Sequence, residues 1–159
     1  NQVHGLASSK LAIEQHVKTA DMVIGAVLIP GAAAPKLVTN HLVAQMKPGS
    51  VLVDIAVDQG GCFEDTRATT HSDPTYQVHQ STFYCVANMP GAVPTTSTYA
   101  LTNATLPYTV ALANKGWRQA LTDDASLAKG LNTHAGSLTN KPVGEAVGID
   151  AVDPETVLA

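Results

Sequence analysis

Charged residues, aromatic residues and cysteines are all scarce in this chain of 159 residues, and each shortage excludes a class of protein. Only 14% of the residues are charged, the formal net charge is −4, and no basic patch alternates with aromatic residues, so we expect no nucleic-acid binding. The longest apolar run, residues 22–30, is too short to span a bilayer. Two cysteines do not make a disulfide framework; we expect reduced thiols, which favours a cytoplasmic setting.

Several catalytic signatures are missing as well. The sequence contains no G-x-G-x-x-G fingerprint, no Walker A motif and no G-x-S-x-G elbow, which removes support for a serine hydrolase. The six histidines lack the H-x-x-x-H and H-E-x-x-H spacings, so we expect no metal site. The chain opens without an initiator Met or a signal peptide and begins as though in mid-domain, so we expect a fragment, a processed piece or a partial sequence.

The residues that are present favour a globular α/β fold. Hydrophobic residues make up 45% of the chain, enough for a core. Helical spacing over residues 9–20, with Ser8 or Ser9 as the cap, and a short helix opening at Thr39 or Asn40 alternate with apolar, strand-like runs. The runs cover residues 21–28, 51–56 and 83–87. This alternation predicts a parallel sheet with right-handed crossovers, and three strands suggest half of a doubly wound sheet.

We expect the first run to be a strand buried on both faces, because its apolar residues are nearly continuous. The segment 57–81 is read as a long polar connection, and loops of that length are usually functional or disordered. Beyond Pro94 the pattern predicts a long helix over residues 97–115 that is kinked at Pro107 and followed by Gly116. The residues before it, 95–98, are read as N-cap residues, and short helices and a turn-rich tail with few apolar residues follow.

Two polar residues at predicted strand ends are the sharpest candidates for chemistry. Asp58 follows the second strand and precedes Gln-Gly-Gly, and Asn88 ends the third strand before Met-Pro-Gly. The carboxyl ends of parallel strands line the ligand crevice of an open α/β sheet. A carboxylate there can relay a proton, and an amide can bind a carboxylate or carbonyl. The alternatives are an Asx turn at Asp58 and a turn residue at Asn88, whereas Asp54, inside the strand, is read as a satisfied structural carboxylate.

The cofactor signal from pattern alone is weak. Residues 30–35, Pro-Gly-Ala-Ala-Ala-Pro, could let a dinucleotide lie across the sheet edge. Four apolar residues are read as core by default: Leu28, Leu37, Ile55 and Val86.

Taken together, a series of segments resembles the alanine dehydrogenases along nearly the whole chain. The most specific is Asp58-Gln-Gly-Gly-Cys-Phe-Glu64. The others are Ala20-Asp-Met-Val-Ile-Gly-Ala-Val-Leu-Ile-Pro-Gly31, Ala34-Pro-Lys-Leu-Val38, Met46-Lys-Pro-Gly49, Val53-Asp-Ile-Ala56, Val86-Ala-Asn-Met-Pro90, Val93-Pro94, Thr96-Ser-Thr-Tyr-Ala-Leu-Thr-Asn-Ala-Thr105, Gly116-Trp-Arg118 and Ala128-Lys-Gly-Leu131. The related transhydrogenase α subunit shares the Leu-Ile-Pro-Gly and Met-Lys-Pro-Gly elements, but we do not expect it to carry the Asp58–Glu64 segment.

The resemblance implies an NAD-dependent enzyme that interconverts L-alanine with pyruvate and ammonia and assembles as a homohexamer. It implies that Asp58 is the active-site aspartate, which assists amine or water as the carbinolamine and imine form and collapse. It implies that Asn88 contacts substrate beside the nicotinamide. The positions that match cofactor-lining residues are Val27, Leu28, Leu37, Ile55, Asp58, Val86, Asn88 and Met89, which replaces the core-only reading of several of them.

The resemblance covers only the carboxyl-terminal portion of these enzymes. Residues 1–93 would be the second half of a Rossmann-type NAD-binding domain, 94–115 a long crossing helix, and 116–159 the end of a separate substrate domain. The Gly-rich phosphate turn, the catalytic His and the substrate-binding Arg and Lys would lie upstream, so catalysis is expected only with that upstream half present. Two alternatives remain open: the NAD(H)-binding domain of a transhydrogenase α subunit, and an inactive fragment.

Overall fold

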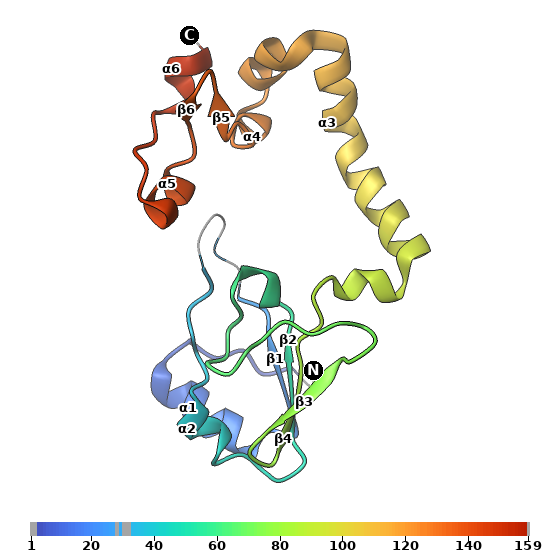
Figure 1. The fold of residues 1–159 in the computed structure, drawn as a ribbon, viewed down its shortest axis with the longest axis vertical. Helices are drawn as coiled ribbons and strands as arrows, with labels where there is room; N and C mark the ends of the chain where they lie inside the picture. The colour runs from blue at the N-terminus through green and yellow to red at the C-terminus, as the bar shows by residue number, and fades with distance from the viewer. Residues whose placement is uncertain (1–2, 28, 30–32, 159) are drawn as a thin grey trace. The chain divides into compact units, whose positions relative to one another are not determined.

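The computed structural model describes residues 3–27, 29 and 33–158, and they form two compact units (Figure 1). One unit lies within residues 3–92 and the other within residues 93–158. The roles that the resemblance gives to residues 1–93, 94–115 and 116–159 remain predictions.

The first unit is built on a four-stranded sheet with the order β1-β2-β4-β3 (Figure 1). Strands β1 (Met22–Gly25), β2 (Val51–Asp54) and β4 (Ser81–Tyr84) are parallel, and β3 (Thr75–Val78) runs antiparallel to β4. The three parallel strands confirm the predicted α/β class. Because they run in the same direction, their carboxyl ends lie along one edge of the sheet.

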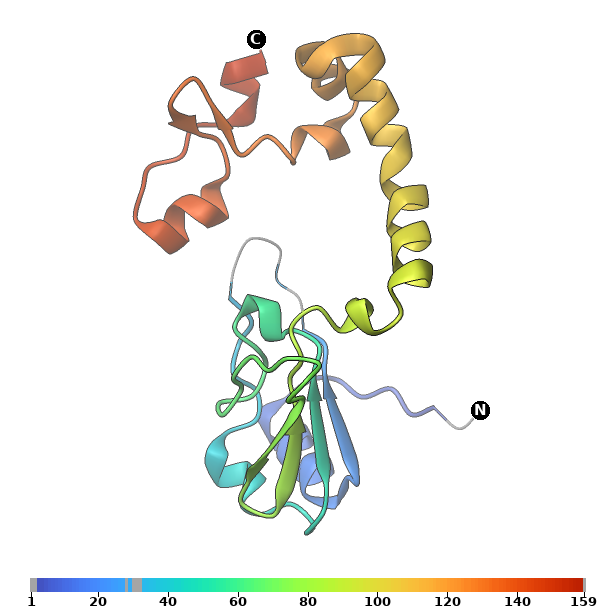
Figure 2. The ribbon, with the colours of Figure 1, turned by 45° about the vertical axis from the view of Figure 1, so that its right-hand side comes forward.

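Helices α1 (Lys10–Thr19) and α2 (Asn40–Val43) lie on the same side of this sheet, α1 in blue and α2 in cyan (Figures 1 and 2). Each begins with a side-chain cap, as the sequence predicted. The Ser9 hydroxyl accepts from the Ala12 N–H at 3.1 Å, and the Thr39 hydroxyl accepts from the Leu42 N–H at 3.2 Å. The core contains Val17, Val38, Leu42, Val43, Met46, Leu52, Phe63 and Phe83.

Strand β1 is covered on one face only, so the prediction of a strand buried on both faces is wrong for the described residues. Met22 and Ile24, which share a face, are 57% and 58% exposed, whereas Gly25 on the other face is buried against Phe63. A continuous apolar sequence indicates that a strand can be buried on both faces. It does not indicate which residues would bury each face.

The segment 57–81 is more ordered than the sequence suggested, because it contains β3. The alternation of polar and apolar residues in Thr-Tyr-Gln-Val is typical of a strand, but it covers only four residues within a polar stretch, and the strand was missed for that reason. Tyr76 fixes it: its hydroxyl donates to the Asp65 carbonyl at 2.9 Å and accepts from the Arg67 N–H at 3.0 Å. The Tyr76 ring lies 5.4 Å from that of Phe83, and burial raises the pKa of its hydroxyl.

The second unit begins with a long helix and continues into short elements (Figure 1). In chain order these are α3 (Pro94–Asp123), α4 (Ala125–Ala128), β5 (Thr133–His134), β6 (Ser137–Leu138), α5 (Lys141–Val147) and α6 (Pro154–Leu158). The Arg118 guanidinium donates to the carbonyls of Val157 at 2.7 Å and Leu158 at 3.1 Å, which ties the tail to α3.

Two details of α3 differ from the prediction. The helix starts at Pro94, so residues 95–98 lie inside its first turns, and Val93 at the N-cap makes no side-chain cap bond. The non-helical residue is Gly116, with φ 72° and ψ 161°, and not Pro107. Pro107 is exposed, so solvent can satisfy the carbonyl that its missing N–H leaves free, whereas Gly116 takes a positive φ because it has no Cβ.

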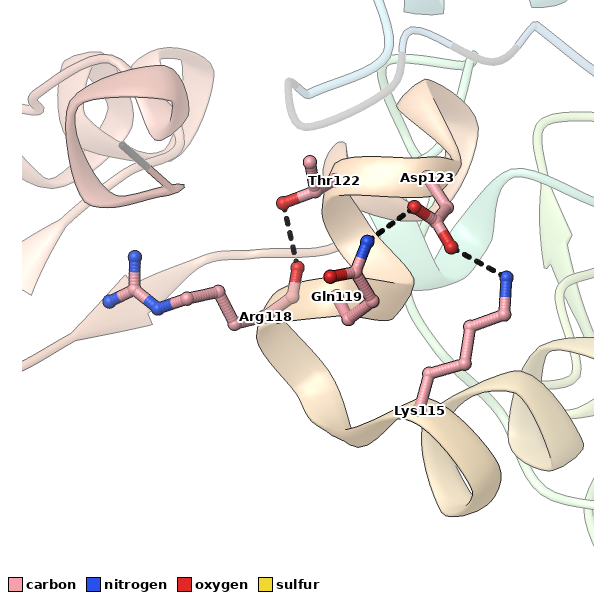
Figure 3. Close-up of polar contacts among 5 residues, drawn as sticks. All are labelled: Lys115, Arg118, Gln119, Thr122 and Asp123. Carbon is pink, nitrogen blue, oxygen red and sulfur yellow. Dashed lines mark hydrogen bonds and ion pairs between the residues drawn. The ribbon is translucent and has the colours of Figure 1, made fainter.

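A carboxylate clamp spans this break (Figure 3). Asp123 accepts from Lys115, on the other side of Gly116, at 2.6 Å and from the Gln119 amide at 2.6 Å, each bond on a different oxygen. These two donors, Lys115 first, hold the pKa of Asp123 below its ordinary value.

Replacing Lys115 with Gln should move the pKa of Asp123 back toward its ordinary value of about 3.9. A carboxyl group whose pKa is lowered by folding stabilises the fold above its unfolded pKa, and this contribution is lost as the pH falls through the lower, folded value. The variant should therefore lose part of that acid-sensitive stability. The measurement is an NMR titration of the Asp123 carboxyl carbon. Lys129→Gln, which removes the same charge elsewhere in the unit, should leave the titration unchanged.

Candidate functional site

A cavity of about 290 Å³ lies at the carboxyl ends of β1 and β2. Residues after β1 form one part of its wall and residues after β2 the other. The lining residues are Ala26, Val27, Ile55, Ala56, Asp58 and Gln59. Three of the residues predicted from the sequence, Val27, Ile55 and Asp58, are thereby brought together at one site.

Asp58 lies in a single 3-10 turn, η1 (Val57–Gln59), which Ile55 and Ala56 connect to the end of β2. Its side chain is exposed, and none of the described residues donates a hydrogen bond to its carboxylate. The Asx-turn alternative is therefore not supported within the described part of the chain. The turn ends at Gly60, which has φ 89°, a conformation that glycine adopts without the steric cost of a Cβ.

A neighbouring segment holds the loop that carries Asp58. The Ala34 N–H donates to the Gln59 carbonyl at 3.1 Å, the Lys36 ammonium donates to the Gly60 carbonyl, and the Leu37 N–H donates to the Cys62 carbonyl at 2.7 Å. Leu37 was predicted to line the cofactor. Its side chain faces a second, apolar cavity of about 360 Å³, which it shares with Val27.

Asn88 lies at the start of a turn, η2 (Met89–Ala92), with φ 57°. Asn tolerates this left-handed conformation better than most residues, so the turn-residue reading is supported. The Asn88 carbonyl accepts from the Gly91 N–H at 2.9 Å and from His71 Nε2 at 3.0 Å. Its exposed side-chain amide has no partner among the described residues. Since β4 neighbours β2, Asn88 and Asp58 lie at the same sheet edge.

His71 is the residue of this site that the sequence reasoning missed. It lies in the segment read as a polar connection, and no sequence signal links it to Asn88. The other described residues that were predicted to line the cofactor are not among those that line the cavity of about 290 Å³. Val86 is fully buried and presents no surface, Met89 is partly exposed, and Leu28 lies outside the described residues.

Both cysteines, Cys62 and Cys85, are free, as predicted. Both are also buried, and burial raises the pKa of each thiol. In the part of the chain that the structure describes, no group of three His, Cys, Asp or Glu side chains is arranged to hold a metal ion. Across the same residues, no helix has both the length and the apolar character needed to cross a membrane.

Comparison with known proteins decides the family. The model of the family described as "Alanine dehydrogenase/PNT, C-terminal domain" matches residues 1–141. The chain belongs to this family.

Relatives within the alanine dehydrogenase/PNT family are close in sequence. An alanine dehydrogenase of Mycolicibacterium smegmatis is 62% identical over 96% of this chain, which corresponds to 41% of the relative. A solved structure of an L-alanine dehydrogenase superposes with a TM-score of 0.73 at 51% identity, covering 96% of this chain and 40% of that one. The chain thus spans about two fifths of the length of these relatives.

A transhydrogenase from Sinorhizobium meliloti is a weaker match. Its solved structure gives a TM-score of 0.52 at 33% identity and covers 58% of this chain and 26% of that one. The comparisons therefore support both the family and the Rossmann-type α/β fold. Within the family, this chain is more similar to the alanine dehydrogenases than to the transhydrogenase.

Proposed function

We propose that this chain is the carboxyl-terminal portion of an NAD-dependent L-alanine dehydrogenase, which converts L-alanine reversibly to pyruvate and ammonia. The observation that carries the proposal is the placement of Asp58. Its exposed carboxylate, without a described donor, stands at a largely apolar cavity on the edge where parallel strands end. The chain around it is 62% identical to an alanine dehydrogenase.

The cavity residues suit the nicotinamide end of NAD. The walls formed by Ala26, Val27, Ile55 and Ala56 are apolar, which favours packing against the flat face of the nicotinamide ring, neutral in NADH and carrying a delocalised positive charge in the oxidised form. The volume of about 290 Å³ is smaller than a dinucleotide needs, so these residues account for the ring and not for the pyrophosphate. NAD, when bound, supplies the chemistry by accepting a hydride from C2 of alanine.

The residues of this chain would do the positioning and the proton handling. Asp58 would bind the ammonium group of alanine, and would hold a proton for water or amine as the carbon–nitrogen bond breaks or forms. Asn88, whose amide can both donate and accept, would orient the substrate carboxylate or carbonyl. His71 would keep the turn at Asn88 in place through the Asn88 carbonyl.

The proposed activity also requires the amino-terminal portion of the relatives, which this chain does not span. We refer to this sequence joined to the corresponding amino-terminal portion as the complete enzyme. That portion would supply the Gly-rich turn, the catalytic His and the substrate-binding Arg and Lys that the resemblance implies. A homohexameric assembly and a cytoplasmic setting belong to the same proposal; the buried free thiols support the latter.

The test is an assay of the complete enzyme for reduction of NAD that depends on L-alanine, followed at the absorbance of NADH. We expect turnover with alanine and the reverse reaction with pyruvate and ammonia. A complete enzyme that bound NADH but did not reduce NAD with any amino acid as substrate would favour the transhydrogenase-type binding domain. A protein that bound no NADH and had no activity would favour the third reading, a structural fragment.

A further inference from the structure

A second aspartate lies beneath the candidate site. Asp54, the last residue of β2, is fully buried, and its carboxylate accepts bonds from the loop that follows the strand. Oδ1 accepts from the Ala56 N–H at 3.1 Å. Oδ2 accepts from the Cys62 N–H at 2.8 Å, the Phe63 N–H at 3.4 Å and the Thr66 hydroxyl at 2.5 Å.

These donors come from both sides of Asp58. Ala56 precedes it by two residues, and Cys62 follows it by four, so one carboxylate joins the two ends of the loop that presents Asp58. A buried carboxylate is costly unless it is well hydrogen-bonded, and bonds to a charged acceptor are stronger than neutral ones. The same bonds that keep Asp54 buried therefore keep this loop in a single path.

The packing leaves the loop little freedom to take another path. A Cβ added at Gly61 would lie 2.5 Å from Asp54 Oδ2 and 2.4 Å from Thr66 Cγ2. The backbone of Gly61 thus runs directly over the contact between the carboxylate and the Thr66 hydroxyl. A shift of that contact would move the backbone next to Asp58.

We propose that Asp54 and Thr66 are positioning residues, which fix the loop over residues 55–62 and thereby hold the Asp58 carboxylate at the cavity. This inference rests on the proposed function, because it concerns the placement of Asp58 for catalysis. Thr66 is not among the residues that line the cavity, and its hydroxyl donates to Asp54. Its effect on the reaction would be transmitted through Asp54 and the loop.

Thr66 offers a matched pair of variants. Thr66→Val removes the hydroxyl and keeps the branched shape, so Asp54 loses the side-chain hydrogen bond that Thr66 donates. Thr66→Ser keeps the hydroxyl and removes the methyl group. If the hydroxyl positions the loop, the Thr66→Val variant should have a kcat about tenfold below that of the wild type, whereas the Thr66→Ser variant should keep kcat within about twofold of the wild type.

The experiment measures kcat and the KM values for alanine and for NAD in the complete enzyme, together with hydrogen exchange of the amides over residues 55–62. Both are recorded at a temperature where each variant is fully folded by circular dichroism. We expect Thr66→Val to lower kcat with little change in the KM for NAD, and to speed exchange in this loop alone. Thr66→Ser should resemble the wild type in both measurements.

Three results would overturn the inference. Thr66→Val could lower the thermal midpoint and leave kcat unchanged, which would assign Thr66 a structural role only. Thr66→Ser could lose as much activity as Val, which would point to the methyl group. Unchanged exchange over residues 55–62 in the Val variant would show that the hydroxyl does not hold the loop. A wild-type complete enzyme without alanine-dependent activity is a separate outcome, since it removes the proposed function as well.

Discussion

Asp58→Asn should lower kcat of the complete enzyme by about 1,000-fold, because a positioned acid or base contributes roughly 10²–10⁴ to a rate and Asn cannot hold the proton. The substitution preserves size and leaves the described hydrogen bonds of the loop in place, since none uses the Asp58 side chain. Folding and the affinity for NADH should therefore change far less than kcat. Steady-state kinetics and a titration with NADH provide the two measurements.

The control for this variant is Asp73→Asn, which makes the same chemical change in the same unit. Asp73 is exposed and lies outside the cavity lining, so kcat should stay within about twofold of the wild type. An Asp58→Asn enzyme that kept a tenth or more of the wild-type kcat would contradict the role assigned to this carboxylate.

The second large effect is expected at Gly61, and the neighbouring Gly60 supplies its control. Both glycines have positive φ, 89° at Gly60 and 77° at Gly61, where an Ala costs about 1–2 kcal/mol. At Gly60 nothing lies within 4 Å of an added Cβ, whereas at Gly61 the Cβ would overlap Thr66 and Asp54. Overpacking adds about 1–3 kcal/mol.

Gly61→Ala should therefore destabilise the first unit by about 3 kcal/mol, and Gly60→Ala by about 1 kcal/mol. The comparison is made on the complete enzyme by thermal unfolding and by hydrogen exchange over residues 55–66. The Gly61 variant should also lose activity, because the loop that holds Asp58 has to move. Equal effects of the two substitutions would show that only the backbone conformation matters here, and that the contact with Asp54 and Thr66 does not.

The parts of the fold that the sequence predicted well are those with a local cause. Ser9 and Thr39 cap helices because a hydroxyl reaches an N–H three residues ahead, and this is visible in the sequence. The apolar run at 51–56 becomes β2, and Asp58 follows it at the sheet edge. Its placement follows from the rule that parallel strands end along one edge.

The parts that were missed depend on contacts between distant segments. Strand β3 pairs with β4 and is held by Tyr76, whose bonds to Asp65 and Arg67 no periodicity reveals. The bare face of β1, with Met22 and Ile24 exposed, depends on which elements cover it. His71 contacts the Asn88 carbonyl across 17 positions of sequence, so its place in the site could not be read from spacing.

Asp54 is a residue whose burial was predicted from the sequence but whose hydrogen-bond donors were not. The sequence led to a satisfied structural carboxylate, and the structure confirms that it is buried and hydrogen-bonded. Its donors on both sides of Asp58 could be identified only once the loop had a path.

The most direct test of the central claim is to follow the hydrogen on C2 of alanine. The complete enzyme is incubated with NAD and L-alanine carrying deuterium at C2, and the products are analysed by mass spectrometry. We expect one deuterium in each NADH formed, with one pyruvate and one ammonia per NADH. NADH without deuterium, or no NADH formed from alanine at all, would contradict the assignment of this chain to an alanine dehydrogenase.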